Sequence, residues 1–230
     1  MSQGRSFPRL FVPLLAGASL RDRVIGCIGA LLGIALTAFV CTRLPQSSAA
    51  LPFLAAPIGA SAVLVFAVPA SPLAQPWAVF GGNIVSAMAG VTTAHLFGHS
   101  ALVAGIAVAG AILAMSLLRC LHPPGGAVAL TAVIGGPAIL NAGYLFAFMP
   151  VAINSFLLVA IGLIFHRFSG HSYPHRATMT QGVEPAREPG FHPEAIDLAL
   201  ADLGETFDVS REDLDLLLQR AAFHEGRRVH

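Results

Sequence analysis

The stretch LRCLHPPGGAVALTA, residues 118–132, interrupts a long apolar run with an arginine, a histidine, two prolines and two glycines. Proline removes a backbone donor and glycine weakens a helix, so this stretch would leave polar backbone groups unpaired in lipid. Such a break is stable at membrane depth only where protein or water satisfies those groups. We therefore predict that residues 118–132 line a cavity inside the protein and do not face lipid.

The composition of the whole chain is typical of a membrane protein. Of its 230 residues, 55% are hydrophobic and 11% are charged, and the mean hydropathy is +0.73. The twelve acids are Asp22 and eleven residues from Glu184 onward, and lysine is absent. Residues 24–166 therefore carry only two full charges, Arg43 and Arg119, and both are positive.

Hydropathy predicts an all-α, polytopic membrane helical bundle. About 20 apolar residues cross a hydrocarbon core of about 30 Å, and four runs are long enough, namely 24–42, 77–96, 101–118 and 143–165. Two further runs, 51–68 and 121–134, contain prolines and are typical of broken or re-entrant helices. Arginines flank the domain at both ends, which predicts cytoplasmic termini and four or six crossings.

The two interrupted runs resemble each other, which predicts an internal duplication. PIGASAVL at residues 57–64 aligns with PPGGAVAL at residues 123–130, and Asn83 and Asn154 then fall in corresponding later helices. The repeats would be residues 24–97 and 98–168. The halves are inverted if the interrupted segments cross and parallel if they are re-entrant, and the sequence leaves both open.

Three regions follow from these patterns. Residues 1–23 are expected to form a cytoplasmic or interfacial segment, and residues 24–168 the transmembrane domain. Residues 169–230 are expected to form an acidic cytoplasmic linker with two short helices. The first should begin near Pro193, and the second near Ser210, where SRED resembles a capping box.

The prolines of the opening stretch predict a ligand site. A helix that begins at Pro123 or Pro124 leaves amide groups free at the positive end of its dipole, which favours an anion. Because residues 24–166 contain no carboxylate, the fixed charge there also favours an anion over a cation. The predicted substrate-binding residues are Arg119, His122, Pro123, Pro124, Gly125, Gly126 and Ala127, with Asn83, Asn154, Arg43, Pro57 and Gly59. We expect no metal and no cofactor.

The same residues also fit structural roles. Arg119 ends a span and can extend to the membrane surface, and Arg43 fits a loop or an interface. His122 fits a helix cap or a paired core group, and Asn83 and Asn154 fit hydrogen bonds between helices. Glycines elsewhere predict close helix packing, namely Gly26, Gly29, Gly33, Gly81 and Gly82.

The motif LHPPGGA, residues 121–127, in a small polytopic membrane domain resembles the signature of the HPP family. The resemblance covers about residues 20–168, and HSYPHR and DLALADL are similar to the tail of bacterial members. It implies an integral membrane domain whose plant plastid and cyanobacterial relatives are assigned as nitrite transporters. Many bacterial members continue into CBS modules, which the 230 residues do not include, so we expect a short natural version or a truncated chain. The similarity to bacterial members implies a bacterial inner membrane.

The sequence predicts a transporter or channel for a small monovalent anion, with nitrite ahead of nitrate, formate and chloride. The alternative is a membrane-embedded anion sensor or scaffold whose tail recruits a partner. An enzyme is not expected, because no nucleophile and base accompany the histidines. The expected partners are the anion, the lipid bilayer and further copies of the chain, and not nucleic acid.

Overall fold

A computed structural model describes residues 19–44, 51–177, 193–203 and 208–226 of the chain. All regular structure within these residues is helical, and no strand occurs among them, so the all-α fold is confirmed. Residues 1–18 of the predicted N-terminal segment lie outside the described residues.

The first half contains α1 (Leu20–Arg43), α2 (Ile58–Ala67), the short 3₁₀ turn η1 (Pro72–Ala74) and α3 (Pro76–Phe97). Helix α1 begins four residues before the predicted span because Ser19 and Asp22 form a capping box. The Ser19 hydroxyl accepts from the Asp22 amide at 3.2 Å, and the Asp22 carboxylate accepts from the Ser19 amide at 3.0 Å. Residues 20–23 therefore belong to the first helix.

The second half contains α4 (Ala101–Leu117), α5 (Pro123–Ile134), α6 (Pro137–Ala142), the π-helical turn η2 (Ala147–Ala152) and α7 (Ile153–Ser169). Helix α5 begins at Pro123, as predicted. Helix α2 is shorter than its apolar run, since it begins only after Pro57.

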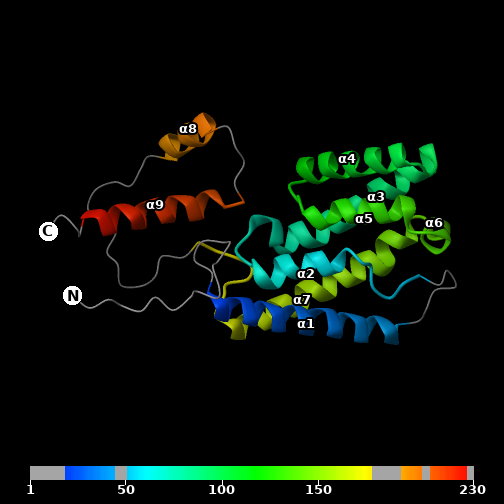
Figure 1. The fold of residues 1–230 in the computed structure, drawn as a ribbon, viewed down its shortest axis with the longest axis horizontal. Coiled ribbons are helices and arrows are strands. Elements are labelled where there is room, and N and C mark those ends of the chain that lie inside the picture. The colour runs from blue at the N-terminus through cyan, green and yellow to red at the C-terminus, as the bar shows by residue number, and fades with distance from the viewer. Residues whose placement is uncertain (1–18, 45–50, 178–192, 204–207, 227–230) are drawn as a thin grey trace, which may run out of the picture.

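Six helices, α1 to α5 and α7, run alternately in opposite directions along the bundle (Figure 1). The start of α1 lies beside the end of α2, where the Arg23 guanidinium donates to the Ala67 carbonyl at 3.4 Å. The end of α7 lies at the same place, where His166 bonds to the Val65 carbonyl at 2.9 Å. The chain thus enters the bundle at the start of α1 and leaves it after α7 at the same end.

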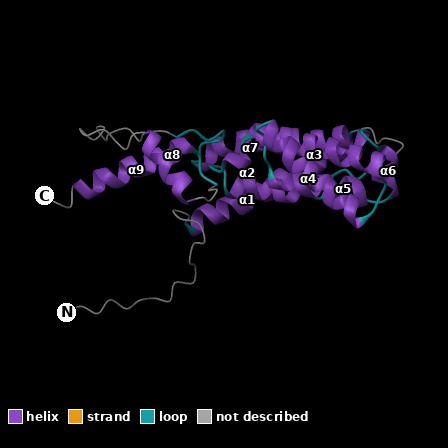
Figure 2. Ribbon diagram, turned by 90° about the horizontal axis from the view of Figure 1, so that it is seen from above, coloured by secondary structure: helices purple, strands orange, loops and turns teal. Residues whose placement is uncertain are grey.

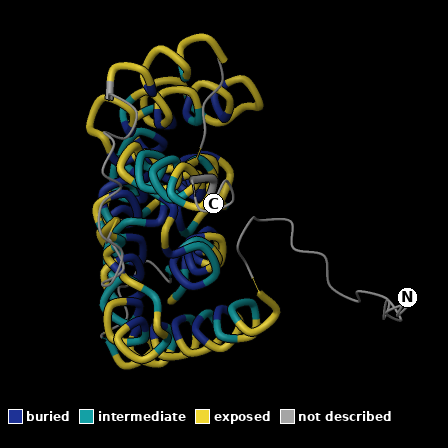
Figure 3. The backbone as a smooth tube through the Cα atoms, turned by 90° about the vertical axis from the view of Figure 1, so that its left-hand side faces the viewer, coloured by how far each residue is buried: buried dark blue, intermediate teal, exposed yellow. Residues whose placement is uncertain are grey.

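The outer surface of the bundle is apolar, as a lipid-facing surface requires. Figure 3 shows that the buried residues lie in the interior of the bundle and that the exposed residues lie on the outward faces of its helices. Those faces carry large hydrophobic side chains, including Leu31, Leu36, Phe39, Leu102, Leu113, Phe156 and Phe168.

Two helical stretches among the described residues are long and apolar enough to cross a membrane alone, α1 and the continuous stretch Ala147–Ser169. Helices α2, α4 and α5 are apolar but shorter. Two of the four full spans predicted from hydropathy are thus long and apolar enough to cross a membrane. The number of crossings stays a prediction.

Glycines let the helices approach closely. A methyl group at Gly26 would lie 3.1 Å from the Cα of Ala67, and one at Gly29 would lie 2.6 Å from the ring of Phe66. On α3, a methyl group at Gly82 would lie 2.6 Å from the Cβ of His122. The predicted packing role is confirmed for these glycines, whereas Gly81 lies only against Trp77 of its own helix.

The tail forms α8 (Pro193–Leu203) and α9 (Arg211–Gly226), close to the predicted positions, beyond one end of the bundle (Figure 2). Ser210 caps α9, because its hydroxyl accepts from the Asp213 amide at 3.1 Å.

Candidate functional site

His122 lies immediately before α5 and is completely buried. Its Nδ1 is 2.8 Å from the Leu73 carbonyl, and its Nε2 is 2.8 Å from the Ser61 hydroxyl. A carbonyl oxygen can only accept, so Nδ1 carries the hydrogen, and in the neutral ring Nε2 accepts from Ser61. The Leu73 carbonyl therefore selects the tautomer of His122.

The network continues from Ser61 into two further helices. Asn83 Nδ2 donates to the Ser61 oxygen at 3.2 Å and to the Ser155 oxygen at 3.1 Å. Ser61, Asn83 and Ser155 are all fully buried. Four elements, α2, α3, α7 and the start of α5, thus meet in one uncharged polar network, hereafter the His122 network.

One atom of the His122 network has no partner within the described part of the chain, namely the buried Oδ1 of Asn83. The amide cannot simply be reversed, because Ser61 donates to His122 and must accept from Asn83. A buried acceptor without a donor costs about 1–3 kcal/mol. The Asn83 oxygen therefore favours any molecule that brings a hydrogen-bond donor to it.

The network lies within the thickness of the bundle. Ser61 precedes the end of α2, at Ala67, by six residues, which is about 9 Å along a helix axis. Because Ala67 contacts Arg23 at the start of α1, the network is one to two helical turns inside that end.

Gly125 allows α5 to pack closely against α3. A methyl group there would lie 2.9 Å from the sulfur of Met115 and 3.1 Å from the Gly82 carbonyl, and would collide with Ser86. The Gly125 amide donates to the His122 carbonyl at 2.8 Å. Contrary to the expectation from sequence, this amide is not free.

The rest of the motif divides into buried and open positions. Pro124 is buried and Pro123 is exposed. Gly126 is half-buried, with the nearest atom to an added methyl group at 3.7 Å on Val108, and Ala127 is exposed. Gly126 is therefore the motif glycine with room beside its backbone.

The two arginines lie outside the His122 network. Arg119 is exposed in the turn after α4, with a left-handed φ of 54°. Arg43 is exposed at the end of α1, and its guanidinium carbon is 4.6 Å from the centroid of the Phe39 ring. The structure thus does not bring either guanidinium to the buried His122 ring.

Asn154 and the start of α2 form a separate cluster. Asn154 Oδ1 accepts from the Ala55 amide at 2.8 Å, and Nδ2 donates to the Phe53 carbonyl at 3.1 Å and the Cys41 sulfur at 3.2 Å. Pro57 is buried there, whereas Gly59 is exposed with nothing within 4 Å of an added methyl group. Asn154 thus bonds helices and the segment before α2 together, as its structural interpretation predicted.

Sequence reasoning missed Ser61, Ser155 and the Leu73 carbonyl. Ser61 lies inside PIGASAVL, residues 57–64, and Ser155 follows Asn154 in an otherwise apolar run, so a search for small polar residues at membrane depth would have found both. The Leu73 carbonyl carries no sequence signal, because any residue supplies one.

Comparisons with known proteins support a membrane protein. Two transmembrane proteins of Dictyostelium discoideum are 37% identical over 121 residues and 35% identical over 120 residues. The matches cover 51% and 50% of this chain, but only 39% and 42% of the relatives. No solved structure matches. The model of the HPP transmembrane region matches residues 16–174, and the chain therefore belongs to the HPP family of integral membrane proteins.

Proposed function

We propose that the protein moves a small monovalent anion, nitrite first, across the membrane through the centre of this bundle. The observation that carries the proposal is the His122 network, a buried polar cluster at the start of an interrupted helix with one acceptor unpaired. No carboxylate occurs among residues 24–166 to repel an anion.

We further propose six crossings with both termini on one side. The alternating directions of the six helices favour this arrangement (Figure 1). Asn83 and Asn154 each lie seven residues after the start of their helical stretches, at Pro76 and Ala147. This agreement favours an inverted duplication of residues 24–97 and 98–168.

The chemistry of the network favours an anion that can take up a proton. The unpaired Asn83 oxygen accepts a hydrogen bond, which nitrous or formic acid supplies and chloride does not. Exposed Arg119 would attract the anionic form to the end of α4. The open backbone at Gly126 would contact it next, and the acid form would cross at Asn83.

Flux into proteoliposomes tests this proposal. Nitrite and formate are compared with nitrate and chloride at about pH 6 and about pH 7.5, with protein-free liposomes correcting for acid that crosses lipid unaided. We expect saturable nitrite and formate flux that rises at the lower pH, because each pH unit changes the acid fraction about tenfold. Equal flux with and without protein would overturn the proposal.

Two matched pairs of variants locate the path. Arg119→Gln should lower nitrite flux, whereas Arg43→Gln, at the other arginine of residues 24–166, should leave it near wild type. Gly126→Ala should lower flux without unfolding the protein, since the added methyl group has room. Gly59→Ala, also at an open glycine, is its control. Wild-type flux in both Arg119→Gln and Gly126→Ala would reject this path.

A second candidate is a membrane-embedded anion sensor. It is favoured by the position of the tail, since Asp208 bonds to Ser71, in the same loop whose Leu73 carbonyl bonds to His122. The sensor predicts saturable nitrite binding in detergent with no flux in liposomes.

A further inference from the structure

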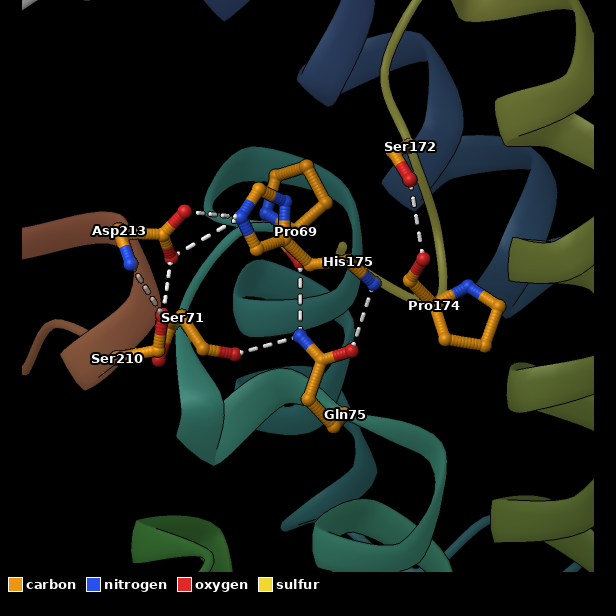
Figure 4. Close-up of polar contacts among 8 residues, drawn as sticks. All are labelled: Pro69, Ser71, Gln75, Ser172, Pro174, His175, Ser210 and Asp213. Carbon is orange, nitrogen blue, oxygen red and sulfur yellow. Dashed lines mark hydrogen bonds and ion pairs between the residues drawn. The ribbon is translucent and has the colours of Figure 1, made fainter. Parts of the chain in front are cut away.

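The C-terminal tail is bonded to the loop between α2 and α3. The Ser71 hydroxyl donates to the Asp208 carboxylate, with oxygen distances of 2.8 and 2.9 Å. Beside it, the Asp213 carboxylate at the start of α9 lies 2.8 and 3.0 Å from His175 Nε2 (Figure 4). The tail therefore holds both the loop and the segment that follows α7.

Gln75 joins these two segments. Its Oε1 accepts from the His175 amide at 2.8 Å, and its Nε2 donates to the carbonyls of Pro69 at 3.0 Å and Ser71 at 2.8 Å (Figure 4). Gln75 thus bonds the loop to the segment that follows α7, and Ser71 bonds the same loop to the tail.

The same loop supplies the acceptor that selects the tautomer of His122. The Ser71 hydroxyl, which donates to Asp208, also accepts from the Leu73 amide at 3.1 Å. The Leu73 carbonyl then accepts from His122 Nδ1 at 2.8 Å. Three hydrogen bonds, through Ser71 and Leu73, therefore connect a tail carboxylate to the buried His122 network.

The seam between the tail and the bundle is polar and incompletely packed. An open hollow of about 260 Å³ lies in it, lined by residues of both sides that include Ala70, Gln75, Arg176 and Glu212. A polar, loosely packed contact is typical of segments that separate and rejoin. The helix core, by contrast, is closed by glycine contacts such as that of Gly82 with His122.

We propose that the tail is a clasp for the His122 network, with Asp208 and Asp213 as positioning residues. When the clasp is closed, the Leu73 carbonyl is fixed and His122 is protonated at Nδ1. When the tail leaves, the carbonyl is free to move, His122 loses its Nδ1 acceptor, and Ser61 and Asn83 are free to exchange donor and acceptor roles. The inference goes beyond the proposed function, because it applies to a transporter or to a sensor.

Nitrogen-15 NMR of histidine rings in the full chain, held in lipid nanodiscs, tests the clasp. The His122 signal is assigned with His122→Asn. We expect the Nδ1-protonated pattern in the wild type and a mixed pattern in the double variant Asp208→Ala, Asp213→Ala. The control is Asp215→Ala, because Asp215 accepts from Gln219 within α9 itself. An unchanged His122 signal in the double variant would overturn the proposal.

Hydrogen exchange provides a second readout, at the loop itself. The amides of the loop, at Ala70, Ser71, Leu73, Ala74 and Gln75, should exchange at least about tenfold faster in the double variant, while those of α3 stay protected. Exchange at the wild-type rate would contradict the clasp. The swapped pair His175→Asp, Asp213→His should restore slow exchange, which a merely unfolded variant would not do. Neither readout uses a transported ion, so failure of the clasp and failure of transport are separately visible.

Discussion

The starts of α2 and α5 correspond in the predicted duplication, yet they differ in how they are packed. The start of α5 is closed, because Gly125 lies against α3 and His122 is fully buried. The start of α2 is open at Gly59, which has nothing within 4 Å of an added methyl group. Similar motifs with proline and glycine therefore carry different constraints in the two halves.

The paired asparagines show the same difference in their hydrogen bonds. Asn154, near the start of α2, uses both its oxygen and its nitrogen. Asn83, in the His122 network, has an oxygen without a partner among the described residues. A cluster with satisfied groups, such as that of Asn154, is typical of structure, and a network with an unsatisfied group, such as that of Asn83, is where a ligand gains most.

The largest effect should separate the two glycines. Gly125→Ala should lower the free energy of unfolding by about 1–3 kcal/mol, because the methyl group has no room beside Met115 and Gly82. Gly59→Ala should raise it by about 0.5–1 kcal/mol, since alanine favours a helix. Thermal unfolding in detergent, followed by Trp77, the single tryptophan, measures both. An equal change in the free energy of unfolding in the two variants would contradict the difference in packing between the two helix starts.

The next effect should separate the two asparagines. Asn154→Leu should destabilise the protein by about 1–3 kcal/mol, because it leaves the Ala55 amide and the Phe53 carbonyl without a partner. Asn83→Leu should cost less, since it also removes an unsatisfied oxygen. The unfolding midpoints of the two variants test this order, and a larger loss for Asn83→Leu would contradict it.

A smaller effect of opposite sign should separate the two arginines. Arg119→Gly should stabilise the fold by up to about 1 kcal/mol, because glycine adopts the left-handed φ of 54° without strain. Arg43→Gly should destabilise it by about 0.5–1 kcal/mol, because Arg43 ends α1 in helical conformation. Denaturant titration in detergent compares the two, and destabilisation by Arg119→Gly would argue against a strained turn.

The smallest effect is the loss of tail docking in acid, when Asp213 takes up a proton. Burial raises the pKa of Asp213, but hydrogen bonds from His175 and Ser210 and the charge of His175 outweigh it and hold the pKa below its ordinary 3.8. A carboxylate with a lowered pKa stabilises docking above its ordinary pKa and loses that contribution as the pH falls through the lower value. Glu212 and Arg176 line the adjacent hollow and add to the local charge.

We therefore expect the Asp213 contribution to persist from neutral pH to about pH 4 and to fade below 3.8. The distance between spin labels on α3 and α9 should then increase in acid for the wild type. Asp213→Ala should show a flatter profile, and identical profiles would contradict the assignment to Asp213.

Much of the helix layout followed from the sequence. The two adjacent prolines predicted that α5 begins at Pro123 or Pro124, and the SRED pattern predicted the cap of α9 near Ser210, because both signals act within one turn of the chain. The membrane class followed from the absence of acids among residues 24–166 and from hydropathy.

The candidate site depended on tertiary structure. His122 was evident in the sequence as a motif residue, but its partners Leu73 and Ser61 are 49 and 61 residues away, so no local pattern joins them. The sequence predicted that Gly125 is free to contact a ligand. The packing of the helices shows that α3 fills the space beside Gly125. Short-range signals are set by backbone geometry within a few residues, whereas hydrogen-bond partners across the bundle are set by how six helices pack.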